Sequence, residues 1–304
     1  MKKQIFALAK QVIAAVLIPL LALSGAPVSL QADTLYKANG DATLLEQATT
    51  VGFNTNANHA EGSALTSGDI LSYTNLITAA VTNRLTTTSG GTITLGGIRV
   101  GEFFNGSLLN PVGAITIRNL SSGGAQTLNI GASGIDLSLA TQNLTFQRDT
   151  GGSANMTVAA TVNQIWTMRT GRTLSLADAP LTLTGNVTIQ GAAAAVTLGG
   201  SGTGAISGGG NLIIDGAQSG GATVVNLSGT NTAWTGAVQV GSSSHLRASA
   251  QLNLDQSAAS QNKLADAQTL TINHSTVNLQ GTGGGTETVA GVTLGRGLSA
   301  ITRS

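Results

Sequence analysis

The sequence contains three histidines, His59, His245 and His274, the side chains most often used as general bases and metal ligands. Serine and aspartate are scattered throughout, but no Gly-x-Ser-x-Gly turn of the kind that carries a hydrolase nucleophile is present. The zinc motif His-Glu-x-x-His is also missing. The chain has no cysteine, which removes thiol catalysis, thiolate zinc sites and iron–sulfur clusters. We therefore predict no catalytic residue and no metal site.

A second candidate chemistry is the cleavage of polysaccharides, which needs two or three carboxylates, often with a basic residue, on one sheet face. Asp136, Asp149, Arg169 and Arg172 are spaced so that a chain wound into coils could stack them. The simpler interpretation is that Asp136 bonds a turn and that the two arginines flank a turn at Gly171. We keep a polysaccharide lyase or hydrolase as the alternative to a non-enzymatic protein.

Two further patterns resemble ligand loops but lack the required spacing. The segment Gly199–Gly204 has Ala205 where the third glycine of a dinucleotide loop would stand, and no Gly-Lys-Ser/Thr follows. Asp215, Asp255 and Asp266 are spaced like turn residues, and the Gly-Gly-x-Gly-x-Asp calcium repeat is absent. We therefore expect no cofactor and no calcium, and we interpret the glycine-rich segment as a turn.

The aromatic content is only 3%, with Trp166 and Trp234 as the two tryptophans. They could form a platform on which a sugar stacks, but we predict that they pack in the core. Charged residues make up 9% of the chain and the net charge is +1, so a basic face for nucleic acid is not expected. Without Lys2, Lys3 and Lys10, the 14 basic residues fall to 11 against 13 acidic ones.

Residues 1–32 have the three-part pattern of a secretory signal peptide. Met1–Lys10 carries three lysines, Val12–Leu23 is almost wholly apolar, and a stretch of small residues runs to Ala32. The apolar run is shorter than the roughly 20 residues of a spanning helix. We predict cleavage before Asp33 and export from a bacterial cell, with a retained N-terminal anchor as the alternative.

Short alternating segments dominate the rest of the chain. Residues 33–91 are the least regular part, which we interpret as a capping segment; Asp41–Ala48 could form a short helix, and Leu71–Leu85 is ambiguous. From Thr92 onward, polar and apolar residues alternate over four or five positions at a time, which predicts strands with one buried face. These segments are Thr92–Leu95, Ala114–Ile117, Thr127–Ile130, Ile135–Leu139, Thr173–Leu176, Leu181–Thr184, Val187–Ile189, Ala195–Leu198, Asn211–Ile214, Val224–Leu227, Ala237–Val240, Leu270–Ile272 and Thr276–Leu279.

We predict an all-β fold, a parallel β-helix over residues 92–304. A sandwich, a porin-like barrel or a propeller would use more large aromatic residues than this chain has. A β-helix needs few aromatics, because each coil buries its apolar side against the neighbouring coils. At about 20–25 residues per coil, the exported chain would form roughly 11–13 coils.

The most specific stretch, Asn226–Gly241, reads NLSGTNTAWTGAVQVG. It resembles the autotransporter-associated β-strand repeat of bacterial surface and secreted proteins. The stretch departs from the repeat in the inserted Ala233 and in Gln239, where the repeat has threonine. Upstream, Gly134–Ser138 and Ile165–Met168 resemble coils that precede the repeat in such proteins. The residues that match the repeat are Leu227, Ser228, Gly229, Asn231, Thr232, Trp234, Gly236, Val238 and Val240.

The resemblance implies a right-handed β-helical passenger or stalk that is secreted or held at the outer membrane and acts in adhesion or presentation. The implied partners are surface glycans or proteins of a host or neighbouring cell. Long members of the family end in a membrane barrel, whereas this sequence ends in mid-repeat at Ser304. We therefore expect the repeat region to be truncated, with membrane contact only through the signal peptide or a missing C-terminal anchor.

Overall fold

The computed structural model describes residues 34–37, 53–54, 67–85, 91–119, 124–148, 156–199, 206–216, 221–243, 249–256, 262–281 and 286–304. The chain divides into two units between Ala32 and Asp33, and all the described residues belong to the second. Within the described residues every regular element is a β-strand, which confirms the all-β prediction. The possible helix at Asp41–Ala48 lies outside the described residues.

Sheet 1 has 14 strands, and from β3 to β24 neighbouring strands are parallel. Its main path contains β2 (Phe53–Asn54), β1 (Thr34–Lys37), β3 (Ile70–Tyr73), β5 (Gly91–Val100), β9 (Gln126–Leu137), β12 (Gln164–Met168), β15 (Val187–Gly191), β18 (Leu212–Gly216), β20 (Val238–Val240), β22 (Thr269–Ile272) and β24 (Gly291–Leu294). A side branch from β9 adds β11 (Met156–Ala160), β14 (Leu181–Leu183) and β17 (Ile206–Ser207).

Sheet 2 has nine strands, all parallel to their neighbours. They are β4 (Val81–Arg84), β8 (Ile115–Arg118), β10 (Leu144–Gln147), β13 (Thr173–Ser175), β16 (Ala195–Leu198), β19 (Thr223–Leu227), β21 (Ala250–Asp255), β23 (Thr276–Gln280) and β25 (Ala300–Arg303). The chain alternates between the two sheets, so strands that pair within a sheet belong to successive turns of a solenoid.

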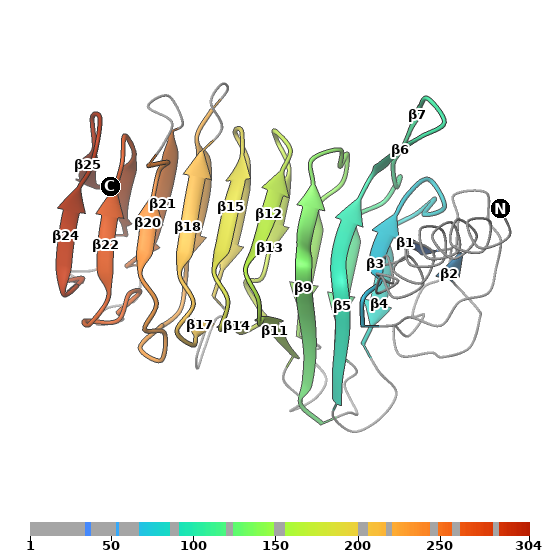
Figure 1. Ribbon diagram of the computed structural model, residues 1–304, viewed down its shortest axis with the longest axis horizontal. Helices are drawn as coiled ribbons and strands as arrows, with labels where there is room; N and C mark the ends of the chain where they lie inside the picture. Colours follow the sequence, from blue (N-terminus) through green and yellow to red (C-terminus); the bar gives the residue numbers. More distant parts are fainter. Residues whose placement is uncertain are drawn as a thin grey trace, which may run out of the picture. The chain divides into compact units, whose positions relative to one another are not determined.

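The solenoid is right-handed, as predicted. In Figure 1 the strands of sheet 1 run upward in front, the chain returns behind them through sheet 2, and each turn advances toward the C-terminus at the left. This is the hand that parallel crossovers almost always take. The alternating segments from Thr92 onward all form strands, and the ambiguous stretch Leu71–Leu85 contains β3 and β4. The parallel ladders therefore begin before Thr92.

The length of a turn varies more than the sequence analysis expected. In sheet 2 a short turn leads from Leu174 to its register partner Val196, whereas a much longer one leads from Val81 to Ile115. The longer turn contains a hairpin of β6 (Glu102–Phe104) and β7 (Ser107–Leu109). The solenoid consequently has about 7 turns, fewer than expected, because long loops join some of its short strands.

Aliphatic side chains stacked in register form the core. Leu174, Val196, Val225, Leu252 and Val277 are successive partners in sheet 2, and none of them is more than 1% exposed. Burying one such side chain contributes about 1.5–3 kcal/mol. Because each turn covers the apolar side of the next, the alternation seen in the sequence becomes a continuous core along the solenoid.

A ladder of asparagine side chains stabilises the bend that leads into sheet 1. The Oδ1 atom of Asn163 accepts the backbone N–H of Asn186 at 2.9 Å, and Asn186 Oδ1 accepts that of Asn211 at 3.0 Å. Asn211 Oδ1 in turn accepts the N–H of Ala237 at 2.8 Å. Each amide thus satisfies a backbone donor that the bend would otherwise leave unpaired.

Candidate functional surface

Asp136 bonds a turn, as the simpler interpretation predicted, and it also forms an ion pair. Its Oδ1 atom accepts the backbone N–H of Ser138 at 2.9 Å, and its Oδ2 atom lies 3.7 Å from Arg99 Nε. The Arg99 guanidinium also lies 3.4 Å from Glu102 Oε1. These side chains are partly exposed, so solvent screens the ion pairs and their contribution to stability is small. Asp149, the second carboxylate of the predicted set, lies outside the described residues.

The two predicted arginines hold successive turns together. Arg169 Nη1 donates to the carbonyl of Leu139 at 3.0 Å, and Arg172 Nη1 donates to that of Thr141 at 2.5 Å. Between them Gly171 has φ +71°, so the arginines flank a tight turn as predicted. Both guanidinium groups thus donate hydrogen bonds to backbone carbonyls about one turn earlier in the chain.

His274 occupies a turn with φ +46°, and His59 and His245 lie outside the described residues. Among the residues that the structure describes, no group of three or more His, Cys, Asp or Glu side chains could hold a metal ion. Of Gly199–Gly204 only Gly199 is described, with φ +89°. Asp266 accepts the side-chain amide of Asn262 at 2.7 Å within a turn.

Both tryptophans are in the core, which confirms the prediction and rules out a stacking platform. Trp166 and Trp234 are 0% exposed. Trp166 Nε1 donates to Gln164 Oε1 at 2.7 Å, and Trp234 Nε1 donates to the carbonyl of Gly210 at 2.8 Å. Each indole N–H therefore has a partner, as burial requires.

Asn231, in the segment that resembles the repeat, connects three turns. Its side chain is 0% exposed, its Oδ1 atom accepts the N–H of Ile206 at 2.8 Å, and its Nδ2 atom donates to the carbonyl of Lys263 at 2.7 Å. Its own backbone N–H donates to the carbonyl of Asn262 at 3.1 Å. One buried amide thus satisfies backbone groups of the preceding and the following turns.

The remaining residues of that segment also contribute to stacking. Ser228 Oγ donates to the carbonyl of Gly199 at 2.6 Å. A Cβ atom on Gly236 would lie 1.9 Å from the carbonyl oxygen of Gly210, so only glycine fits there. Leu227, Val238 and Val240 are buried, Gly229 has φ +77°, and Thr232 is exposed.

A row of hydroxyl and amide side chains runs along the outer face of sheet 2. Its members are register partners in nine successive strands and lie on the face of the sheet opposite core residues such as Leu174 and Val196, although Asn253 and Asn278 are themselves buried. We call this set the hydroxyl–amide row: Thr82, Thr116, Thr145, Ser175, Thr197, Asn226, Asn253, Asn278 and Thr302.

The hydroxyl–amide row is uncharged and regularly spaced, since neighbouring strands lie about 4.8 Å apart. Toward the C-terminus its members bond one another: Asn253 Nδ2 donates to Asn226 Oδ1 at 2.7 Å, and Thr302 Oγ1 donates to Asn278 Oδ1 at 3.2 Å. Thr197 is only partly buried, and among the described residues its hydroxyl has no hydrogen-bond partner. The row therefore offers donors and acceptors to a partner in its middle section.

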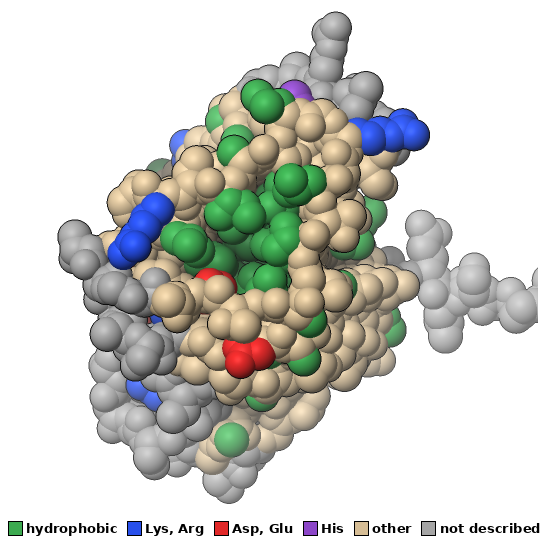
Figure 2. Space-filling model, turned by 90° about the vertical axis from the view of Figure 1, so that its left-hand side faces the viewer, with side chains coloured by type: hydrophobic (Ala, Val, Ile, Leu, Met, Phe, Trp, Pro, Cys, Tyr) green, Lys and Arg blue, Asp and Glu red, His purple; other side chains and the backbone are tan. Residues whose placement is uncertain are grey.

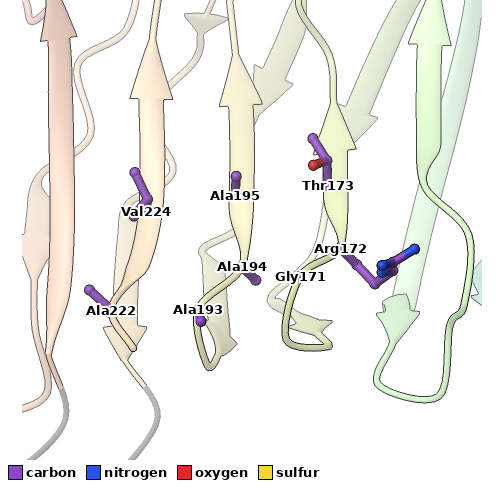
Figure 3. A pocket seen from close by; sticks show the side chains of 8 residues that line it. All are labelled: Gly171, Arg172, Thr173, Ala193, Ala194, Ala195, Ala222 and Val224. Carbon is purple, nitrogen blue, oxygen red and sulfur yellow. The ribbon is translucent and has the colours of Figure 1, made fainter. Parts of the chain in front are cut away.

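A shallow hollow of about 410 Å³ lies beside the middle of the hydroxyl–amide row (Figure 3). It is lined by Gly171, Arg172, Thr173, Ala193, Ala194, Ala195, Ala222 and Val224, which come from three successive turns. Small side chains at the bends before β13, β16 and β19 create the hollow.

The C-terminal end of the solenoid is apolar and uncovered. Figure 2 looks onto this end and shows hydrophobic side chains gathered at its centre. Leu294, Leu298 and Ile301 are 63%, 85% and 53% exposed, respectively. β24 and β25 are the last strands of their sheets, so each leaves one edge without a strand partner.

The β6–β7 hairpin, which projects beyond the turns in Figure 1, was not predicted from the sequence. Its turn is formed by Asn105 and Gly106, with φ 48° and 79°, and Asn-Gly between two apolar pairs is the signal that could have found it. Phe104 and Leu109 pack on Leu76, whereas Phe103, on the opposite face, is 64% exposed.

Comparison with known proteins gives no family. No protein-family model, no curated protein and no solved structure matches this chain. Among the described residues, no helix has the length and apolar character needed to cross a membrane.

Proposed function

We propose that the chain is a non-enzymatic, exported β-solenoid that acts in adhesion or presentation at the bacterial surface, as a passenger or stalk. The observation that carries the proposal is the outer face of sheet 2, where nine register positions hold uncharged hydroxyl or amide side chains, seven of them at least partly exposed. A rigid solenoid with a repeated outer face suits the display of an extended binding surface.

The use made of the charged residues supports this proposal. Arg169 and Arg172 bond backbone carbonyls of an earlier turn, and Asp136 bonds a backbone N–H within its own turn. These are three of the four side chains expected to serve a polysaccharide-cleaving enzyme, and each of the three has a structural partner; the fourth, Asp149, lies outside the described residues. A general acid and a nucleophile would need carboxylates that face a common substrate.

The N-terminal pattern supports export. Lysines precede an apolar run that is too short for a comfortable membrane span, and small residues follow it up to Ala32. The chain has no cysteine, so its exported form would need no disulfide formation to fold.

Expression of the full chain in a bacterial host tests the proposal. We expect the exported form to begin at Asp33 and to be digested by protease added to intact cells. The double variant Leu17→Lys/Leu20→Lys, which charges the apolar run, should keep Met1 and remain inside the cell, whereas Leu17→Ile/Leu20→Ile should behave like the natural sequence. Retention of the natural chain in the cytoplasm with Met1 intact would refute export. Failure of the exported chain to attach to any cell surface would refute adhesion.

A further inference from the structure

We propose that the hollow beside the hydroxyl–amide row binds a neutral polysaccharide strand that lies along the solenoid axis across β13, β16 and β19. This inference rests on the proposed function and specifies its ligand. It depends on two sets of register partners: Ser175, Thr197 and Asn226 in the row, and Thr173, Ala195 and Val224, two positions earlier in the same strands.

Both sets face outward because residues two apart in a strand lie on the same side. Between them Leu174, Val196 and Val225 are 0% exposed and point into the core. The surface therefore presents polar groups along one line and the apolar side chains of Ala195 and Val224 along the next. A sugar ring has the same division, with hydroxyl groups at its edge and C–H groups on its face.

Side chains of the polar line have hydrogen-bonding groups that can still engage a ligand. Thr197 has no hydrogen-bond partner among the described residues, so its hydroxyl can both donate and accept. Ser175 Oγ accepts the backbone N–H of Ala177 at 3.4 Å, which leaves its hydroxyl proton free to donate. Asn226 uses its Oδ1 atom to accept from Asn253 and can donate through its amide nitrogen.

Charge determines which polymer fits. Among the described residues that line the hollow, Arg172 alone is charged, and its guanidinium donates to the Thr141 carbonyl of the preceding turn. Figure 3 shows its side chain directed away from Ala195 and Val224. A polyanion would meet a single guanidinium, which is directed away from the small side chains of the hollow, whereas a neutral polysaccharide can exchange hydroxyl hydrogen bonds with the row.

The dimensions of the hollow fit a polysaccharide strand rather than a small compact ligand. Three strands about 4.8 Å apart give contacts over about 10 Å along the axis. The hydroxyl–amide row continues on both sides of the hollow, to Thr145 in one direction and to the buried Asn253 in the other.

Affinity electrophoresis of the purified chain tests the proposal, with dextran, mannan or xyloglucan in the gel and hyaluronan as the polyanion. We expect at least one neutral polysaccharide to retard the chain and hyaluronan not to do so. Thr197→Val keeps the shape and removes one hydroxyl, and it should weaken binding about fivefold, the equivalent of about 1 kcal/mol for one hydrogen bond. Ala195→Arg fills the hollow and should abolish the retardation.

Thr188→Val is the matched control, because Thr188 belongs to the same turn and faces outward from β15 in sheet 1. The affinity of this variant should stay within about twofold of that of the natural chain, a smaller change than the loss of one hydrogen bond would cause. The proposal is overturned if no neutral polysaccharide retards the chain, if only hyaluronan does, or if Thr188→Val weakens binding as much as Thr197→Val. These outcomes are measured on purified protein, so they are independent of whether the chain is exported.

Discussion

Replacement of Asn231 by alanine should destabilise three turns at once. The Asn231 side chain is 0% exposed and bonds the N–H of Ile206 and the carbonyl of Lys263. Alanine would leave both backbone groups buried without a partner, and each such group costs about 1–3 kcal/mol. The expected loss is therefore about 2–6 kcal/mol, before any contribution from the space that the shorter side chain leaves.

Hydrogen exchange measures this effect where it arises. The Ile206 amide should lose at least about 30-fold in protection, which corresponds to about 2 kcal/mol. Urea unfolding followed by the two buried tryptophans should show a lower midpoint. Thr232→Ala, an exposed neighbour in the same segment, should change stability by less than about 0.5 kcal/mol. Unchanged protection of Ile206 in Asn231→Ala would refute the idea that this amide connects the turns.

Three further predictions concern packing, the exposed end and pH. Gly236→Ala should destabilise the fold because its Cβ would lie 1.9 Å from a carbonyl oxygen, whereas Gly209→Ala, with its nearest atom at 3.7 Å, should not; thermal unfolding of the pair compares them. The natural chain should associate as its concentration rises, because the C-terminal end exposes Leu298 and Ile301, and sedimentation should find Leu298→Lys/Ile301→Lys monomeric. Burial raises the pKa of Glu287 above its ordinary value, so the fold favours its protonated form. Exchange protection of β24 should therefore fall as pH rises through that pKa, and Glu287→Gln should flatten the dependence.

Much of the fold could be predicted because the alternation of single strands is a local property. Segments such as Leu181–Thr184 and Ala195–Leu198 show their buried face directly in the sequence, and both form the predicted strands. The scarcity of aromatic residues favoured a solenoid, and the two tryptophans are in the core as predicted.

The candidate binding surface could not be predicted, because it depends on which strand lies beside which. The stretch of chain from Thr145 to its partner Ser175 is longer than the stretch from Ser175 to its next partner, Thr197. With unequal loops, no fixed period in the sequence aligns these hydroxyls. The hollow likewise exists only when the small residues of three turns, among them Ala195 and Ala222, come into register.

Cysteine cross-linking in this cysteine-free chain tests that register most directly. Thr197 and Asn226 are paired across β16 and β19, so a disulfide should form rapidly in Thr197→Cys/Asn226→Cys. Thr197→Cys/Val224→Cys places the second cysteine two residues away on the same outer face, about 8 Å from Thr197, beyond the reach of an unstrained disulfide. Rapid closure of the first pair alone is the result we predict. Equal closure of both pairs, or closure of the second alone, would contradict the stacked register on which the hydroxyl–amide row and its hollow depend.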